Sequence, residues 1–460
     1  MSTGLTKSIG KFNISRWTLG SIAAAIFWYV SLFPGRIGSD PVQSVLLMKQ
    51  GESTDWWTGI FFWFLKISTF NGQSIWLASL ISIAILYLSV YFFIFSLPVK
   101  LDTLQKTLFI ICATPIFGNF GVNINHDVFF SSGVLLVLGL SLRHIYVPNT
   151  PPRYSVIGYA IILLLNAKTG YLIIGLLLIY LALTRVKKIT VLVFVLFTII
   201  IFLISGLGIT KSTVPIHFLP ALADLKCVAQ HPEARITNQE WQYLGSIADV
   251  TEWKLPKTCS SMDIAIGSLR SKKLDELNSK EFVTNYFNIA TRNPAIVIQA
   301  HLQRSSQALP PPFFQGPENQ VDRNIQNPVG LNTNTALQLG PSVLHPSIDY
   351  PDFKVENGIL KAFESFVLFF SFLVNQASWF WGWGGLWLWP IFIFILFSLN
   401  VRRPTNLLLL TYPLLANHLI LVLVGPIPAP RYVMSTILTG CILSILLIFR
   451  LFEFTRKGGE

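Results

Sequence analysis

The sequence predicts an all-α polytopic membrane protein with about ten transmembrane segments, surface helices in the first outer loop and one large extracytoplasmic loop. Apolar residues make up 52% of the 460 residues, charged residues only 12%, and the mean hydropathy is +0.57. Soluble domains usually carry about 25% charged residues. Several apolar runs reach the roughly 20 residues that a helix needs to cross a bilayer.

The N-terminal region is expected to begin in the cytoplasm, because basic residues precede the first apolar run and such residues stay on the cytoplasmic side. Trp17–Phe33 is interpreted as the first span, and no cleavable signal peptide is expected. The outer segment 34–73 follows. It contains two amphipathic stretches that are expected to lie on the membrane surface, Pro41–Gln50 and Trp56–Phe70.

The remaining apolar runs are expected to cross the membrane in turn, and the C-terminus is expected in the cytoplasm. The runs are Ser74–Leu97, Leu104–Phe120, Asp127–Arg143, Ile189–Gly208, Trp379–Leu399, Asn406–Val424 and Tyr432–Phe449. Leu360–Val374 is interpreted as a surface helix. The chain thus divides into an N-terminal transmembrane region (1–208), an extracytoplasmic loop domain (209–357) and a C-terminal transmembrane region (358–460).

The apolar stretch Ser155–Leu183 is interrupted by Asn166, Lys168 and Gly170. One interpretation is a single long span with a buried lysine. The other is a pair of half-helices that meet at Asn166–Gly170 near the outer face, as broken helices do where they line a cavity. The second is favoured because it keeps the later basic clusters in the cytoplasm.

The four cysteines fall into two groups. Cys112 and Cys441 lie in predicted spans, where they are expected to be buried thiols. Cys227 and Cys259 lie in the large outer loop, where an oxidising compartment permits a disulfide. The sequence leaves both a disulfide and two free thiols open.

Several function classes are disfavoured. The net charge of +12 comes largely from basic clusters beside the spans, so nucleic acid is not an expected partner. The Walker A, G-x-G-x-x-G, H-E-x-x-H and G-x-S-x-G motifs are all missing from the sequence, which argues against an ATP-driven pump, a zinc protease and a lipase.

Two carboxylates are candidates for chemistry at the outer membrane face. Asp40 precedes Pro41, a pattern typical of a helix N-cap, but it could also act as a general base toward a sugar hydroxyl. Asp127 begins the fourth predicted span. It is either another cap or a ligand for a hydroxyl or a metal, with His126 beside it.

Three cations are candidates for binding phosphate, each with a plainer alternative. Lys168 in the broken segment could bind a phosphate or extend its amine to the membrane interface. Arg431 follows a proline-rich turn at the start of the last span, where it is either an anion ligand or an interfacial arginine. Arg304 and His301 share a predicted amphipathic helix, whose basic face is either solvated or binds the donor.

The order of these features resembles the GT-C superfamily of membrane glycosyltransferases, in particular its bacterial polyprenyl-phosphate-sugar-dependent members. His-Pro is absent where such proteins often have Asp-Trp-His-Pro. The matching segments, in order, are Pro34-Gly35 with Ser39-Asp40-Pro41-Val42-Gln43, Asp55-Trp56-Trp57-Thr58, His126-Asp127, Lys168-Thr169-Gly170, Asn293-Pro294 through Arg304, and Arg431-Tyr432.

The resemblance implies an inverting transfer of a sugar from a polyprenyl-phosphate donor to a glycan, lipid or protein acceptor, on the outer face of a bacterial plasma membrane. Asp40 would be the base, while Lys168 and Arg431 would hold the phosphate. Some members use a divalent metal, although no metal-ligand set stands out here. The alternatives are a lipid-linked glycan transporter or flippase and a non-catalytic assembly protein.

Overall fold

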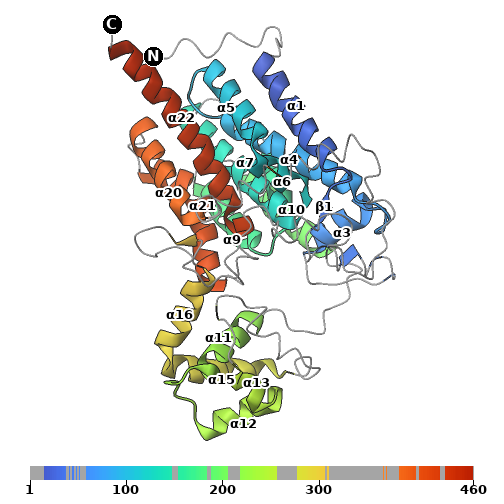
Figure 1. Cartoon of the computed structure of the whole chain (residues 1–460), viewed down its shortest axis with the longest axis vertical. Coiled ribbons are helices and arrows are strands. Elements are labelled where there is room, and N and C mark those ends of the chain that lie inside the picture. Colours follow the sequence, from blue (N-terminus) through green and yellow to red (C-terminus); the bar gives the residue numbers. More distant parts are fainter. Residues whose placement is uncertain are drawn as a thin grey trace.

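The computed structural model is mostly helical (Figure 1). For some residues at the ends of its helices, the structure describes the backbone but not the side chain. The residues that it describes are 15–37, 41, 44–45, 48, 51, 58–147, 154–183, 188–205, 218–255, 259, 277–305, 308–309, 366, 369, 383–399, 404–424 and 430–458.

Within these described residues, four helices are long and apolar enough to cross a membrane, which confirms the helical fold class at this level. They are α4 (Trp76–Ile94), α7 (His126–Tyr146), α21 (Pro404–Val424) and α22 (Met434–Gly458). Other apolar helices are shorter: α1 (Arg16–Ser31), α8 (Tyr154–Leu164), α9 (Gly170–Leu183), α10 (Lys188–Ser205) and α20 (Gly384–Ile393), which continues into the π-helix η7 (Phe394–Ser398).

Helix α7 lies at the centre of the bundle and is the most deeply buried of the four long helices. It packs against α4, α8, α21 and α22. Glycines permit two of these close approaches. A Cβ on Gly133 would lie 2.9 Å from Leu164 Cγ of α8, and one on Gly139 would lie 2.7 Å from the Phe92 ring of α4. Small residues commonly allow such contacts between membrane helices.

The prediction of one continuous span over Leu104–Phe120 is wrong. The structure has two helices there, α5 (Leu101–Ala113) and α6 (Pro115–Val122). Thr114 between them is extended (ψ 142°), and its side chain accepts a hydrogen bond from Phe117 N. Pro115 explains the break, because a proline disfavours helical geometry in the preceding residue and suits the first helical position.

The segment Ser155–Leu183 is also broken, so the interpretation as a single long helix is wrong. Helix α8 ends at Leu164, residues 165–169 form turns, and α9 begins at Gly170. A Cβ on Gly170 would lie 1.8 Å from the Leu164 carbonyl oxygen. The tight connection therefore requires a glycine.

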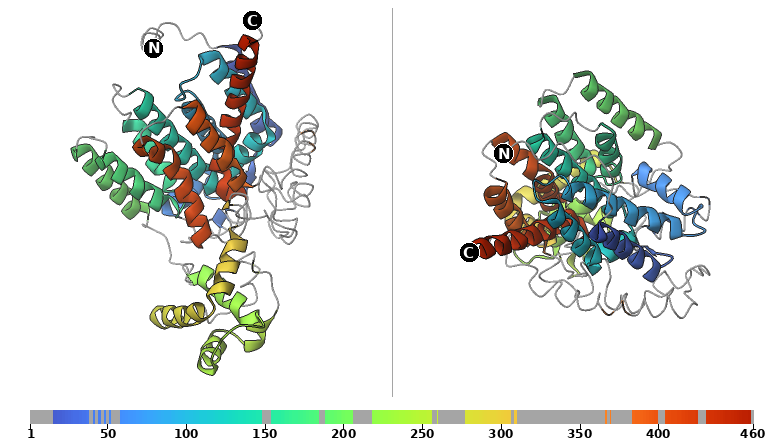
Figure 2. Two further views of the ribbon diagram at one scale, coloured as in Figure 1. Left: turned by 90° about the vertical axis from the view of Figure 1, so that its left-hand side faces the viewer. Right: turned by 90° about the horizontal axis from the view of Figure 1, so that it is seen from above.

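The next helix, α10, lies at the periphery of the bundle (Figure 2). It exposes a row of large apolar side chains, among them Leu192, Leu196 and Leu203. Such a surface suits contact with lipid.

The two surface helices predicted in the first outer segment are described only in part. Within the second, Gly59–Ser68 forms helix α3, which buries Phe61, Phe62 and Leu65. Within the first, the described residues are helical and buried: Pro41, Ser44, Val45 and Met48. Of the predicted helix 360–374, only Phe366 and Phe369 are described, and both are helical and exposed.

The described part of the predicted loop domain forms a separate helical unit below the bundle (Figure 1). Its core includes Trp253, Phe282 and Leu244 and is distinct from the core of the bundle. The helices are α11 (Leu219–Gln230), α12 (Asn238–Ile247), α13 (Val250–Lys254), α15 (Ser279–Arg292) and α16 (Pro294–Arg304).

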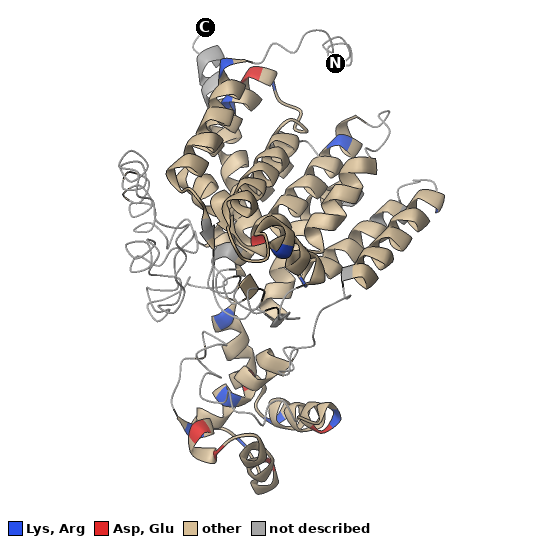
Figure 3. Ribbon diagram, turned by 90° about the vertical axis from the view of Figure 1, so that its right-hand side faces the viewer, with Lys and Arg blue, Asp and Glu red and all other residues tan. Residues whose placement is uncertain are grey.

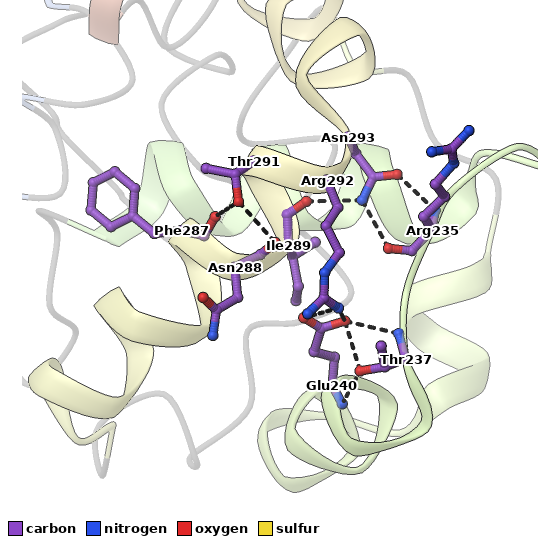
Figure 4. Close-up of polar contacts among 9 residues, drawn as sticks. All are labelled: Arg235, Thr237, Glu240, Phe287, Asn288, Ile289, Thr291, Arg292 and Asn293. Atoms are coloured by element: carbon purple, nitrogen blue, oxygen red, sulfur yellow. Dashed lines mark hydrogen bonds and ion pairs between the residues drawn. The ribbon is translucent and has the colours of Figure 1, made fainter.

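Polar contacts at the junction of α15 and α16 hold this unit together (Figure 4). Arg292 Nη1 donates to both carboxylate oxygens of Glu240, each at 2.9 Å. Asn293 Oδ1 accepts from Arg235 N at 2.7 Å, and its Nδ2 donates to Arg235 O at 3.1 Å. The Asn293-Pro294 motif thus has a structural role, joining the two helices to the segment before α12.

Cys227 and Cys259 form a disulfide, so the interpretation as two free thiols is wrong. Cys112 and Cys441 are free. Beside the disulfide, the fully buried Lys226 donates to the carbonyl oxygens of Glu252, Trp253 and Leu255. The Lys226 ammonium thus satisfies backbone oxygens at the C-terminal end of α13, which lack partners within the helix.

Charged residues are concentrated in two regions of the molecule. Most of those drawn in Figure 3 lie in the loop domain or at the far end of the bundle. Helix α1 begins and α22 ends at that far end, opposite the loop domain (Figure 1).

Candidate functional site

The site begins with a short parallel pairing between β1 (Arg36–Ile37) and β2 (Asn123–Ile124), in which Ile37 lies opposite Ile124. The Pro-Gly motif explains how the first outer segment reaches this place. Gly35 has a φ of +121°, and a Cβ there would lie 2.3 Å from Ser79 Cβ of α4. Ser79 Oγ in turn donates to Val122 O at 2.9 Å, next to β2.

Asp127 lies directly beyond this pairing. Its interpretation as a helix cap is wrong, because Asn125 is the N-cap of α7 and its side chain accepts from Asp127 N at 3.3 Å. Asp127 is 4% exposed. His126 Nε2 lies 3.2 Å from Asp127 Oδ1. A carboxylate beside an imidazole can accept a proton from, or hydrogen-bond to, a hydroxyl group.

Helix α3 joins this pair to the broken segment. The Phe61 ring lies 5.7 Å from the His126 ring, in an edge-to-face arrangement. At the start of the same helix, Thr58 Oγ1 donates to Asn166 O at 2.8 Å. Lys168 lies in the turn that follows and is exposed. The structure therefore gathers His126, Asp127 and the Lys168 turn around α3.

Arg304 lies elsewhere, in the loop domain, and the prediction of a solvated basic face is wrong for it. Its side chain is 1% exposed and its Nη2 forms an ion pair with Asp224 of α11. His301 Nε2 lies 2.9 Å from Asp224 Oδ2, and Tyr286 Oη donates to the same oxygen at 2.9 Å. We refer to these four residues as the Asp224 cluster.

Asp224 and Tyr286 were not predicted from the sequence. One signal was present, since Asp224 lies one turn before the buried Val228 on an otherwise apolar helix face. Inside the cluster, burial and, secondly, the Asp224 carboxylate raise the pKa of Tyr286. The phenol therefore stays protonated and keeps its hydrogen bond to Asp224.

The guanidinium of Arg304 retains donors for another acceptor. Within the described residues, its Nε and Nη1 are buried and have no hydrogen-bond partner. Helix α16 contacts α21 of the bundle, so Arg304 lies at the junction between the loop domain and the bundle. A buried arginine with open donors is suited to a carboxylate or phosphate.

Two predicted site residues are described little or not at all. Asp40 lies outside the described residues, three positions after Ile37. Arg431 belongs to the short 3-10 helix η8 (Pro430–Val433) at the start of α22, and its side chain lies outside the description. Across the residues that are described, no group of three or more His, Cys, Asp or Glu side chains is arranged to hold a metal ion.

Comparisons of the chain with protein-family models, with curated proteins and with solved structures give no match.

Proposed function

We propose that this chain is a membrane glycosyltransferase that moves a sugar from a polyprenyl-phosphate donor to an extracytoplasmic glycan, lipid or protein. The observation that carries the proposal is the register of β1 and β2. Asp40 and Asp127 each follow the paired residues Ile37 and Ile124 by three positions. Since three residues span at most about 10 Å, the backbone of each aspartate lies within about 10 Å of this strand pair.

The proposed chemistry assigns each carboxylate a role. Asp40 removes the proton from the acceptor hydroxyl, whose oxygen attacks the anomeric carbon while the bond from that carbon to the donor phosphate breaks. The attack inverts the anomeric configuration. Asp127, next to His126, binds a hydroxyl of donor or acceptor. The polyprenyl phosphate leaves with the bonding electron pair.

The negative charge that grows on the leaving phosphate needs cations in a water-poor site. Lys168 supplies one from the turn near α3, and Arg431 supplies another from the start of the last span. Arg304 supports this scheme through its open Nε and Nη1 donors, although Asp224 offsets part of its charge.

The proposed topology has about ten membrane segments in the plasma membrane, with α8 and α9 as the two halves of a hairpin whose turn lies near the outer face. Both termini are cytoplasmic and the loop domain is extracytoplasmic. Two findings support this orientation. The Cys227–Cys259 disulfide favours an oxidising compartment for the loop domain. The start of α1 and the end of α22 lie at the opposite end of the bundle.

The proposal is tested with the full chain in proteoliposomes, supplied with radiolabelled polyprenyl-phosphate monosaccharides and extracts of cell-envelope acceptors. We expect label to enter a glycosidic product with release of polyprenyl phosphate. Asp40→Asn should lower the rate by about 10²- to 10⁴-fold. Asp102→Asn is the control, because Asp102 is exposed and pairs only with Lys106 among the described partners.

Three results would contradict the proposal. Full activity in folded Asp40→Asn would remove Asp40 as the base. Label that crosses the bilayer without forming a glycosidic bond would indicate a flippase. Neither transfer nor transport with any donor would favour a non-catalytic assembly protein.

A further inference from the structure

Two consecutive polar residues lie deep in α21, where the sequence is otherwise strongly apolar. Asn417 is 1% exposed and His418 is 5% exposed. Polar side chains within membrane helices are expensive to bury unless they are hydrogen-bonded, and they commonly mark functional positions. Both side chains here reach away from their own helix.

Asn417 holds the start of the last span. Its Nδ2 donates to the backbone oxygen of Tyr432 at 2.8 Å. Tyr432 belongs to η8 and directly follows Arg431. The bond therefore fixes the backbone next to a proposed phosphate ligand.

His418 holds the last described segment of the loop domain. Its Nδ1 is hydrogen-bonded to the carbonyl oxygen of Ala308, four residues after Arg304. A carbonyl only accepts, so Nδ1 carries the hydrogen. Nε2 lies 2.8 Å from Thr436 Oγ1, which donates to it when the ring is neutral. Trp383 Nε1 adds a second bond, to Leu309 O at 2.7 Å.

We propose that Asn417 and His418 are positioning residues that set the spacing of Arg304 and Arg431. Adjacent on α21, they hold the chain just after Arg304 and the chain just after Arg431. A donor phosphate that bridges both arginines needs this spacing to be fixed before it binds. The part of the inference that concerns the phosphate rests on the proposed function; the anchoring of the two segments does not.

The anchoring is tested by hydrogen–deuterium exchange on the detergent-solubilised full chain. His418→Leu should speed exchange in peptides covering 294–309 by about three- to tenfold, the effect of losing one hydrogen bond. Asn417→Leu should do so in peptides covering 430–438. Asn417→Leu should leave 294–309 and α7 unchanged, and His418→Leu, which also loses the bond to Thr436, should leave α7 unchanged. A general loss of stability would loosen all of these segments.

Two control variants sharpen this test. His418→Asn places an amide nitrogen as many bonds from Cβ as Nδ1, so it should restore slow exchange in 294–309. Thr411→Val removes a buried hydroxyl that bonds within α21, to Leu407 O at 3.0 Å, and should change neither segment. Wild-type exchange in both leucine variants, or the same pattern in Thr411→Val, would overturn the anchoring.

The effect on ligand is measured with farnesyl phosphate as the probe, by titration of the same preparations. Both leucine variants should bind it about three- to tenfold more weakly than wild type, and His418→Asn should recover most of the loss. Undiminished binding in variants with loosened segments would overturn the positioning role. No binding by wild type would contradict the proposed function instead, while the exchange data still decide the anchoring.

Discussion

Asp224 is a buried carboxylate held by three side chains, and each of them contributes to keeping its charge inside the loop domain. Its oxygens contact Arg304, His301 and Tyr286, and both Asp224 and Arg304 are 1% exposed. Removing one member of a buried ion pair leaves the other uncompensated, which is far more destabilising than replacing both.

We therefore expect Arg304→Met to lower the stability of the loop domain by about 3 to 5 kcal/mol. The double variant Asp224→Asn with Arg304→Met should recover much of that loss, because no unpaired charge remains. Hydrogen exchange of α11 in the full chain measures both. Arg292→Met is the comparison and should cost less, since Arg292 is half exposed and Thr237 still donates two hydrogen bonds to the Glu240 carboxylate. Equal costs for the two arginines would contradict the interpretation.

Tyr286 makes the stability of the loop domain fall as the pH becomes alkaline. Because its pKa is raised, the folded domain holds the phenol proton more tightly than the unfolded chain. This contribution is present below the ordinary tyrosine pKa of about 10 and is lost as pH rises above it. Tyr286→Phe should therefore show a shallower loss of stability between about pH 9 and about pH 11.

At neutral pH the same substitution should cost about 1 to 2 kcal/mol, because it removes a hydrogen bond to a buried carboxylate. Urea denaturation followed by circular dichroism measures both effects. Tyr243→Phe is the control at neutral pH, since the Tyr243 hydroxyl has no hydrogen-bond partner within the described residues. Identical pH profiles for wild type and Tyr286→Phe would remove Tyr286 from this role.

At the scale of the element, the break between α8 and α9 depends on a single glycine. A Cβ on Gly170 would collide with the Leu164 carbonyl, whereas one on Gly175, in the same helix, meets nothing within 4 Å. The two positions form a matched pair for substitution.

Gly170→Ala should destabilise the bundle by about 1 to 3 kcal/mol, because the connection must shift to remove the clash. Gly175→Ala should be neutral or stabilise the protein by up to about 1 kcal/mol, since alanine favours helix. Thermal unfolding in detergent compares the two variants. A neutral Gly170→Ala would show that the turn does not require glycine.

At the scale of the whole molecule, the oxidation state of the four cysteines differs between the loop domain and the bundle. The disulfide joins residues 32 positions apart in the loop domain, and the two free thiols belong to the bundle. Denatured protein should therefore react with two equivalents of a maleimide before reduction and four after it.

Cys227→Ser should lower the stability of the loop domain by about 3 kcal/mol, because the closed loop restricts the unfolded chain. Cys112→Ser is the comparison outside the domain and should leave loop-domain exchange unchanged. Four reactive thiols before reduction would contradict the disulfide.

Part of this architecture follows from short stretches of sequence. The runs that become α4, α7, α21 and α22 are recognisable because apolar length is a local property. The interruption at Asn166–Gly170 is equally visible, since Asn166, Lys168 and Gly170 lie within five positions of each other in an otherwise apolar run. The break at Thr114 could have been predicted from Pro115, but the apolar run around it hid the signal.

The candidate site depends on contacts that no local pattern contains. His126-Asp127 was visible as a motif, but its approach to the first outer segment required the pairing of β1 with β2, nearly ninety positions away. The burial of Arg304 could not be predicted locally, because its partner, Asp224, is 80 positions distant. Likewise, the anchoring role proposed for Asn417 and His418 depends on the backbone oxygens that they contact.

The sequence by itself thus determined that this is a helical protein with apolar runs long enough to cross a membrane, because the free energy of burying apolar runs is set by composition and length. Tertiary structure alone decided which charged and polar groups meet. These contacts depend on how the helices pack and where the loops close, because each buried polar group needs a hydrogen-bond partner that the fold brings close to it.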